Sequence, residues 1–490
     1  MVTATKWSAL TEIVIRLVSP IAGMILARLL TPEAYGAVAT TSIVITFAEL
    51  FTDAGFQRYI IQHDFVDDDD LNKSANVAFW SNLVMSLIIW GIIIAFRHPI
   101  ARLVGSPELG TAISVACAAI PLASFSSFHK AIFKRNLNFR IPFIGKVFGM
   151  CVTFVVTIPL AIATHSYWAL IISNLINYIF AAVFYRIHSY WRPEFYFSFK
   201  RLRKMFAFCN WIIINSILSW ITNYADIFIV GTHFNQHALG IYKTSISRSN
   251  NALRIISSSV IPVLLPTYSK LQNNIPQLRI TILKIQKYLG VLLMPFGLTM
   301  FLYSDVIVRI YLGNQWFEAA QLIGTWTLVH TFSLLINRFC SNAYVAIGKP
   351  HISLILSVLY AAMLIPTVLL TVDYGLQTLF VVRTLTKLVL LLLHLITIYL
   401  VIRLSPLKII GNIAPQLLGC AAMVGTSFAL NFVSNHIIWK LASMLICLTV
   451  YFGILLLIKQ ERVILLRIWQ YAIEKMPISR QSAASTINPA

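Results

Sequence analysis

Apolar runs of about 20 residues recur along the whole length of this 490-residue chain. A run of that length spans the hydrocarbon core of a bilayer as an α-helix. The chain is 58% hydrophobic and 11% charged, so a water-soluble fold would have to expose much of this apolar surface. Strands of a membrane β-barrel would instead give short segments of alternating polarity. The sequence therefore predicts an all-α polytopic membrane protein.

The apolar pattern predicts about fourteen transmembrane helices. They are expected near residues 7–30, 36–58, 76–96, 109–129, 141–163, 166–187, 207–231, 239–266, 284–304, 317–347, 351–371, 376–401, 412–432 and 436–458. The first run is long and leads directly into the second, so we expect it to be retained and not cleaved as a signal peptide. After Lys459 we expect a short interfacial helix and a Ser/Ala-rich end.

Lysine and arginine gather in four loops that this count places on one side of the membrane. The loops lie within residues 130–140, 186–204, 270–287 and 403–408. Cytoplasmic loops are enriched in these residues, so both termini are predicted to be cytoplasmic. The same enrichment explains most of the net charge of +21, and no nucleic-acid partner is predicted. The acidic run 67–70 is interpreted as a solvated turn, and no metal site is predicted.

A shift of 204 residues reveals a faint internal repeat. It aligns Trp7 with Trp211, Ala34 with Ala238, Gly36 with Gly240 and Thr40 with Thr244. Transporters are often built from duplicated halves with the substrate site between them. We therefore predict a six-helix bundle over 1–190, a second over 200–402, two additional helices over 403–460 and a cytoplasmic tail over 461–490.

The predicted membrane helix near residues 240–262 carries a cationic stripe. At about 100° per residue, its polar members lie within roughly 40° of Lys243. They are Lys243, Ser247, Asn250, Arg254 and Ser257. A positive charge at the centre of a lipid-facing helix costs on the order of 3 kcal/mol. The stripe therefore predicts that this helix lines a hydrated, cationic cavity.

Polar stripes also mark five other predicted spans. They comprise Glu12, Arg16, Ser19 and Gly23; Ser42, Glu49 and Asp53; Asn215, Ser219, Thr222 and Asp226; His330, Asn337, Ser341 and Arg338; and Arg383, Lys387 and His394. Ionisable groups inside a membrane normally face the bundle interior or a water-filled cavity. Stripes in both halves therefore favour one central cavity.

The excess of cations in these stripes favours a large anionic ligand. Arginine offers a fixed donor fork that suits phosphate oxygens, and lysine offers a point charge. The predicted substrate-binding residues are Arg16, Lys243, Asn250, Arg254, Arg338, Arg383 and Lys387. The possible ion-coupling residues are Glu12, Glu49, Asp53 and Asp226.

Purely structural roles remain open for several of these residues. Glu12 and Arg16 are spaced i, i+4 and could pair with each other. Glu49 and Asp53 could pair with a basic group across helices or lie at the cytoplasmic interface. No metalloprotease, hydrolase or phosphate-loop motif occurs in the sequence, so neither an enzyme nor a cofactor is predicted.

Several local strings resemble a known family. They are TKWS at 5–8, LARLLTPEAYG at 26–36, DAGF at 53–56, IIQ at 60–62, RNLNF at 135–139, LPTYSKLQ at 265–272 and GKP at 348–350. Their order and spacing resemble the polysaccharide transporter (Wzx-like) family, close to the colanic-acid-exporter type. That family belongs to the multidrug/oligosaccharidyl-lipid/polysaccharide flippase superfamily. The resemblance spans roughly residues 5–460 and is densest before residue 62.

The resemblance implies a flippase of the bacterial inner membrane. Its substrate would be an undecaprenyl-pyrophosphate-linked oligosaccharide, moved to the periplasmic leaflet by two six-helix bundles that flank a V-shaped cavity. Membrane lipid and a polysaccharide polymerase with its export complex are the other implied partners. A multidrug antiporter of the same superfamily is the main alternative, although it predicts acid-rich stripes. A membrane polymerase or ligase would need a large outer loop, and a scaffold or channel subunit would not need a cationic cavity.

Overall fold

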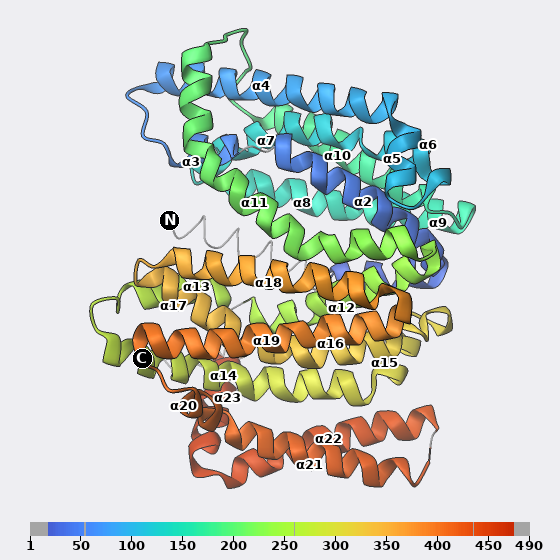
Figure 1. Ribbon diagram of the computed structural model, residues 1–490, viewed down its shortest axis with the longest axis vertical. Coiled ribbons are helices and arrows are strands. Elements are labelled where there is room, and N and C mark those ends of the chain that lie inside the picture. Colours follow the sequence, from blue (N-terminus) through green and yellow to red (C-terminus); the bar gives the residue numbers. More distant parts are fainter. Residues whose placement is uncertain (1–17, 53–54, 259, 435, 475–490) are drawn as a thin grey trace, which may run out of the picture. The chain divides into compact units, whose positions relative to one another are not determined.

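The structure, a computed structural model, describes residues 18–52, 55–258, 260–434 and 436–474 (Figure 1). Every regular element within these ranges is helical. Eleven described helices are long and apolar enough to cross a membrane, and the number rises to 13 if each of two bent pairs is one span. The predicted class of all-α polytopic membrane protein is confirmed. The first predicted span, 7–30, lies partly outside the described residues, and Val18–Leu29 within it forms a shorter apolar helix.

The chain divides into two compact units. Unit 1 comprises Met1–Ser247, Val308–Leu322 and Ser357–Thr386, and unit 2 comprises Arg248–Ile307, Ile323–Leu356 and Lys387–Ala490. Several helices, α12 among them, begin in one unit and end in the other. The predicted division into two six-helix bundles and an appended helix pair stays a prediction.

Unit 1 is built mainly from the first ten labelled helices. They are α2 (Pro32–Thr52), α3 (Phe56–Gln62), α4 (Asp68–Ala95), α5 (Arg97–Leu103), α6 (Gly110–Ala116), α7 (Ala119–Arg135), α8 (Arg140–Val152), α9 (Ile158–Thr164), α10 (Trp168–His188) and α11 (Phe199–His233). A π-helical turn at Thr153–Thr157 joins α8 to α9. The α7 helix packs against both α4 and α10 (Figure 1). Apolar side chains from α3, α4, α7 and α11 form one of its cores.

The span predicted at 36–58 is not one helix. The α2 helix ends at Thr52 and α3 begins at Phe56. Between them, Gly55 has a φ of 85°, a left-handed conformation that interrupts a right-handed helix and that glycine adopts without steric cost.

The acidic run predicted as a solvated turn instead starts α4. The Asp67 carboxylate caps the helix by accepting a hydrogen bond from the Asp70 backbone N–H at 2.7 Å. Negative side chains in a first helical turn interact favourably with the helix dipole. Asp70 also forms an ion pair with Arg201 near the start of α11. The first turn of α4 is therefore bonded to the first turn of α11.

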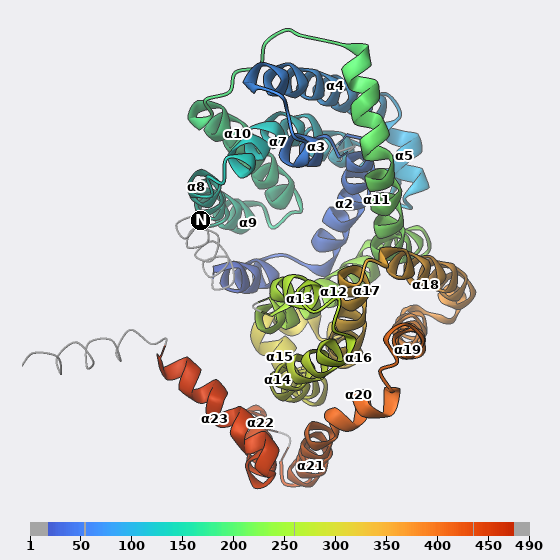
Figure 2. The ribbon, with the colours of Figure 1, turned by 90° about the vertical axis from the view of Figure 1, so that its left-hand side faces the viewer.

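Unit 2 contains most of the remaining helices. The later helices of the chain are α12 (Gln236–Ser257), α13 (Ile261–Ser269), α14 (Ile275–Leu302), α15 (Ser304–Tyr311), α16 (Ala319–Ser333), α17 (Phe339–Ala346), α18 (Pro350–Thr371), α19 (Leu376–Ile402), α20 (Pro406–Asn412), α21 (Ala414–Asn431), α22 (Ile437–Leu457) and α23 (Lys459–Glu474). A π-helical turn at Leu334–Arg338 joins α16 to α17. The α21 and α22 helices lie side by side as a hairpin (Figures 1 and 2).

Two predicted spans are bent. The α12–α13 pair bends by 52° and the α20–α21 pair by 53°. In both pairs the second helix has a proline in its first turn, where proline's missing N–H and fixed φ suit a new helix start.

A buried ion pair fastens the helix that follows Lys459. Glu461 in α23 is fully buried, and its carboxylate lies 2.8 Å from the Lys287 ammonium in α14. Gln416 in α21 donates a second hydrogen bond to this carboxylate at 2.9 Å. The predicted terminal helix is therefore present and is anchored to α14 and α21.

The internal repeat coincides with a close contact between α2 and α12 in unit 1. A Cβ atom on Gly36 would overlap the carbonyl oxygen of Gln236. Likewise, a Cβ atom on Gly240 would overlap the carbonyl oxygen of Pro32. Pro32 and Gln236 are themselves 204 residues apart, so the two glycines make equivalent contacts related by the repeat. Only glycine allows the two backbones to approach this closely.

Candidate functional site

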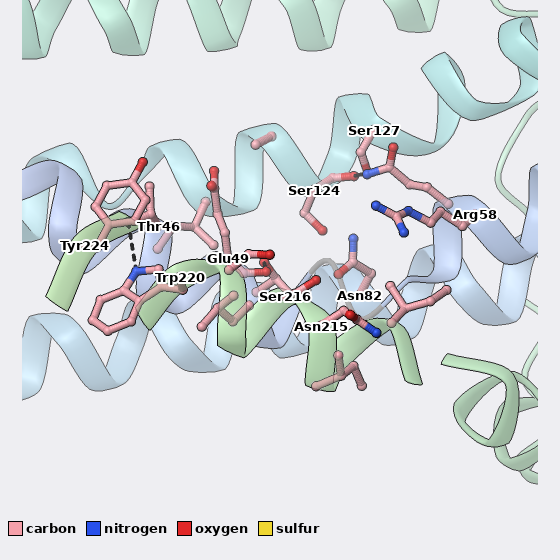
Figure 3. A pocket seen from close by; sticks show the side chains of 18 of the residues that line it. Thr46, Glu49, Arg58, Asn82, Ser124, Ser127, Asn215, Ser216, Trp220 and Tyr224 are labelled. Atoms are coloured by element: carbon pink, nitrogen blue, oxygen red, sulfur yellow. Dashed lines mark hydrogen bonds between the residues drawn. The ribbon is translucent and has the colours of Figure 1, made fainter. Parts of the chain in front are cut away.

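A polar cavity of about 530 Å³ lies inside unit 1 (Figure 3). Its walls come from α2, α3, α4, α7 and α11. That volume lies in the usual range for a small-molecule binding site. A polar cavity among apolar helices is costly to maintain, since buried polar groups need partners. Its lining is therefore the first place to look for function.

Amides, hydroxyls and two charged groups dominate the polar part of the wall. The polar lining residues are Thr46, Glu49, Thr52, Gln57, Arg58, Asn82, Ser124, Ser127, Asn215, Ser216, Ser219, Trp220, Asn223 and Tyr224. Figure 3 shows Glu49 in the middle of the cavity, with Arg58 toward one end and Trp220 and Tyr224 toward the other. The stripes predicted for spans 2 and 7 thus meet here, through Glu49 and through Asn215 and Ser219.

Two buried polar atoms on this wall lack a partner among the described residues. They are the Oδ1 atom of Asn82 and the Oγ atom of Ser124, whose residues are 3% and 6% exposed. A buried acceptor without a hydrogen bond costs about 1–3 kcal/mol. Both atoms are therefore placed to bond a polar ligand in the cavity.

The aromatic end of the cavity is fixed by hydrogen bonding and stacking. The Trp220 indole N–H donates to Thr46 Oγ1 at 3.2 Å. The rings of Trp220 and Tyr224 are stacked, with their centroids 6.0 Å apart. The Lys243 ammonium lies 4.5 Å from the centroid of the Tyr224 ring, within the range of a cation–π interaction. Lys243, a predicted site residue, therefore lies next to the cavity wall.

Asp226 and Arg383, predicted for different roles, are bonded to each other. Asp226 Oδ2 accepts from Arg383 Nε at 2.7 Å, and Arg383 Nη2 lies 2.6 Å from the same oxygen. The Tyr242 hydroxyl donates to this oxygen as well, at 2.8 Å. Asp226 and Tyr242 are fully buried, and Arg383 is 4% exposed. The cluster ties α11, α12 and α19 together within unit 1.

A second cluster, in unit 2, joins two other predicted site residues through Trp326. The Trp326 indole N–H donates to Asn250 Oδ1 at 2.9 Å. The Lys387 ammonium lies 3.7 Å from the centroid of the Trp326 ring and 3.0 Å from His330 Nδ1. Asn250 and Lys387 are thus brought together on α12 and α19, while Trp326 itself was not predicted.

The remaining predicted residues lie elsewhere. Arg254 is exposed and donates to Asn251 Oδ1 at 2.7 Å, one turn earlier on α12. Arg338 is exposed at the π-helical turn. Glu12, Arg16 and Asp53 fall outside the described residues.

Sequence reasoning missed several residues of the cavity. Arg58 is the last residue of the span predicted at 36–58 and belongs to no predicted stripe, yet it lies on the cavity wall after the break at Gly55. Asn82 and Ser124 belong to no stripe. A lone amide or hydroxyl within an apolar span was the signal that could have found them.

The fold and this cavity define a class, the polytopic α-helical membrane proteins with a polar cavity inside the helical bundle. Two solved structures share the fold. One is a lipid II flippase, MurJ, in an inward closed conformation, with a TM-score of 0.71 and 15% identity over 94% of this chain and 100% of that chain. The other is an inward-facing multidrug resistance MATE family transporter of the MOP superfamily, with a TM-score of 0.60 and 14% identity over 79% of this chain and 94% of that chain.

The sequence places the chain in a family within that class. Residues 25–321 match the family described as polysaccharide biosynthesis protein, and the chain belongs to it. It is 22% identical over 304 residues to the succinoglycan biosynthesis transport protein ExoT of Rhizobium meliloti (strain 1021), covering 62% of this chain and 61% of that protein. It is 19% identical over 321 residues to the lipopolysaccharide biosynthesis protein WzxC of Escherichia coli (strain K12), covering 64% of each. The chain thus spans slightly less than two thirds of these relatives, and the predicted family resemblance is confirmed.

Proposed function

We propose that this protein is a flippase for lipid-linked oligosaccharides. Its substrate would be an undecaprenyl-pyrophosphate-linked repeat unit, carried from the cytoplasmic to the periplasmic leaflet for polysaccharide export. The observation that carries this proposal is the polar cavity of unit 1, walled by amides and hydroxyls within an apolar helical bundle. Membership of a polysaccharide biosynthesis family supports it.

The cavity wall suits a sugar. Sugar hydroxyls both donate and accept hydrogen bonds, as do the amides and hydroxyls of Asn82, Ser124 and Asn215. The Trp220 and Tyr224 rings supply flat apolar surfaces against which a sugar ring can pack. The guanidinium of Arg58 and the nearby ammonium of Lys243 supply positive charge for phosphate oxygens.

Some of the predicted site residues lie at or near a polar cluster, and others would first have to break an ion pair before they could bind a ligand. Lys243 lies beside the cavity, and Asn250 and Lys387 share a second polar cluster. Arg383 would have to leave Asp226 before it could bind pyrophosphate, and Asp226 would have to leave Arg383 before it could bind a coupling ion. Glu49 is the predicted ion-coupling residue that lines the cavity. Arg16, Arg254 and Arg338 stay substrate-binding predictions, and Glu12 and Asp53 stay ion-coupling predictions.

The proposed setting is the bacterial inner membrane, with both chain termini in the cytoplasm. The loop charges support this orientation. We propose alternating access, in which the sugar occupies the cavity while the polyprenyl chain stays in lipid. The polymerase that receives the flipped unit is the proposed protein partner, and we assign transport and no catalysis to this chain.

Substitution of Arg58 tests the flippase proposal. The gene is deleted in its host and restored as wild type, Arg58→Gln, Asn82→Leu or Arg102→Gln at matched membrane levels. Arg102 is a matched control, because it is an exposed arginine of unit 1 that does not line the cavity. We expect Arg58→Gln and Asn82→Leu to lower surface polysaccharide about tenfold and to leave repeat units on the cytoplasmic leaflet. Each variant would then have lost about 1.4 kcal/mol of substrate interaction.

Normal polysaccharide in the deletion strain would contradict the flippase proposal. The Glu49 carboxylate gives the cation-coupled multidrug antiporter its supporting observation, because an acid on a cavity wall can attract a cationic drug. The same strains therefore serve for drug susceptibility tests. Sensitivity to cationic drugs with unchanged polysaccharide would favour the antiporter.

A further inference from the structure

An imidazole flanked by two carboxylates lies at one end of unit 1. His237 Nδ1 is 2.6 Å from Glu33 Oε1, and His237 Nε2 is 3.2 Å from Glu318 Oε2. The three side chains come from three segments: the first turn of α2, the first turn of α12, and the loop residue before α16. None of them belongs to the cavity or to the two clusters described above.

The two contacts make different demands on the protonation of His237. A neutral imidazole has one N–H, so it can donate to only one of the two carboxylates. Its other nitrogen then turns a lone pair toward the second carboxylate, and that contact is repulsive. Only the imidazolium, with an N–H on both nitrogens, can donate to Glu33 and Glu318 together. With both glutamates ionised, the two contacts can therefore both be hydrogen bonds only when His237 is protonated.

Other charged groups near these segments have different partners. Arg28, four residues before Pro32, donates to the Ile310 carbonyl at 2.5 Å. Arg309 packs over the Phe317 ring, with its guanidinium 4.7 Å from the ring centroid. The carboxylates that contact His237 are those of Glu33 and Glu318.

Further contacts hold the same three segments together. The first two turns of α2 and α12 pack closely, because Gly36 contacts Gln236 and Gly240 contacts Pro32. The loop before α16 is held by Gln315, which donates to the Ala27 carbonyl at 2.6 Å and to the Leu30 carbonyl at 3.1 Å. Trp316 donates to the Ala27 carbonyl at 2.7 Å. Separation of the ends of α2 and α12 would break the contact between His237 and Glu33, and movement of α12 away from the loop would break the contact with Glu318.

We propose that His237 is a proton-binding site whose occupancy locks this end of the protein closed. The ligand is a proton, and the lock consists of Glu33, His237 and Glu318. The lock rests on the proposed function in one respect: the proposed orientation places this end at the periplasmic surface. There, acidification favours the conformation closed to the periplasm, and loss of the proton releases one carboxylate and allows the end to open. Protons on the outer side would thereby promote the return step of the transport cycle.

Hydrogen–deuterium exchange of the purified protein without substrate tests the lock. Backbone amides of residues 28–36, 233–240 and 313–320 are followed at pH 5.5 and pH 8.0, on either side of the ordinary imidazole pKa of about 6.5. After correction for the intrinsic rate, we expect the wild type to exchange about two- to fivefold more slowly at pH 5.5. Exposed ion pairs have effects of that size.

Two variants and a matched control decide the interpretation. His237→Gln should remove the pH dependence and leave fast exchange at both pH values. His237→Arg carries a permanent charge, so it should keep slow exchange at both pH values. His233→Gln is the control, because His233 lies four residues earlier and bonds to the Ile229 carbonyl, and it should behave as wild type.

A wild type without pH dependence would overturn the proposal, as would His237→Gln with the wild-type response. Because no substrate is present, these outcomes are independent of whether the protein flips oligosaccharides. Normal polysaccharide in the deletion strain, with the expected exchange behaviour of His237, would count against the proposed function alone.

Discussion

Asparagine in place of Asp226 would keep the shape of the side chain and remove its charge. The Arg383 guanidinium would then stay almost fully buried without its carboxylate. At a separation of 2.6 Å and an effective dielectric constant of about 20, Coulomb's law gives roughly 6 kcal/mol for the pair before desolvation is counted. Breaking a buried pair by removing one partner typically costs about 3–5 kcal/mol, and we expect Asp226→Asn to lie in that range.

The magnitude distinguishes a buried charge pair from an ordinary polar contact. Interhelical hydrogen bonds within membranes contribute about 0.6 kcal/mol on average. Removing both charges leaves no orphaned charge, so Asp226→Asn combined with Arg383→Met should be less destabilising than Asp226→Asn alone. Thermal unfolding of the detergent-purified protein, read by size-exclusion chromatography after heating, should show a loss of about 5 °C for the single variant.

The control is Asp373→Asn, which changes an exposed aspartate of the same unit. It should stay within about 0.5 kcal/mol of wild type. A cost below about 1 kcal/mol for Asp226→Asn, or strictly additive effects in the double variant, would refute the reasoning.

Three further predictions concern packing and anchoring. Gly36→Ala should lower the melting temperature, because overpacking costs about 1–3 kcal/mol. Gly91→Ala is the control and should leave the melting temperature unchanged, because a Cβ atom there meets open space. Equal effects of the two substitutions would contradict the tight contact between α2 and α12. Glu461→Gln should speed tryptic cleavage within α23, because Lys287 loses its buried partner, and an unchanged digestion rate would show that other contacts hold the helix. Lys387→Met should lower the free energy of unfolding by about 1 kcal/mol, because the cation–π contact with Trp326 is lost. Thermal unfolding measures this change, and an unchanged melting temperature would contradict the prediction.

Helices were predictable from the sequence because a membrane demands long apolar runs, and a run is a local property. The Gly55 break was not predicted, since a single glycine within an apolar span does not by itself show that the chain turns. Stripes identify the polar face of a helix, which is why Glu49 and Asn215 could be expected to line a cavity.

A stripe does not reveal which neighbour that face meets. Asp226 and Arg383 are 157 residues apart in sequence, and nothing local indicates that they bond to each other. Arg254 shares a stripe with Lys243, yet it is exposed and bonded to Asn251 on its own helix. Pairings between residues far apart in sequence depend on tertiary packing, and helical periodicity does not predict them.

The contact between α2 and α12 also bears on the history of the chain. Gly36 and Gly240 contact each other's helices through equivalent atoms, as the same patch does on both subunits of a two-fold symmetric dimer. Such a contact is expected if a half-length ancestor once paired with a copy of itself before the gene was duplicated and fused. In that ancestor, the position now held by Glu33 and, 204 residues later, by His237 would have been occupied by one residue type. Two glutamates or two histidines cannot form an ion pair, so the bond between Glu33 and His237 became possible only after the two copies diverged.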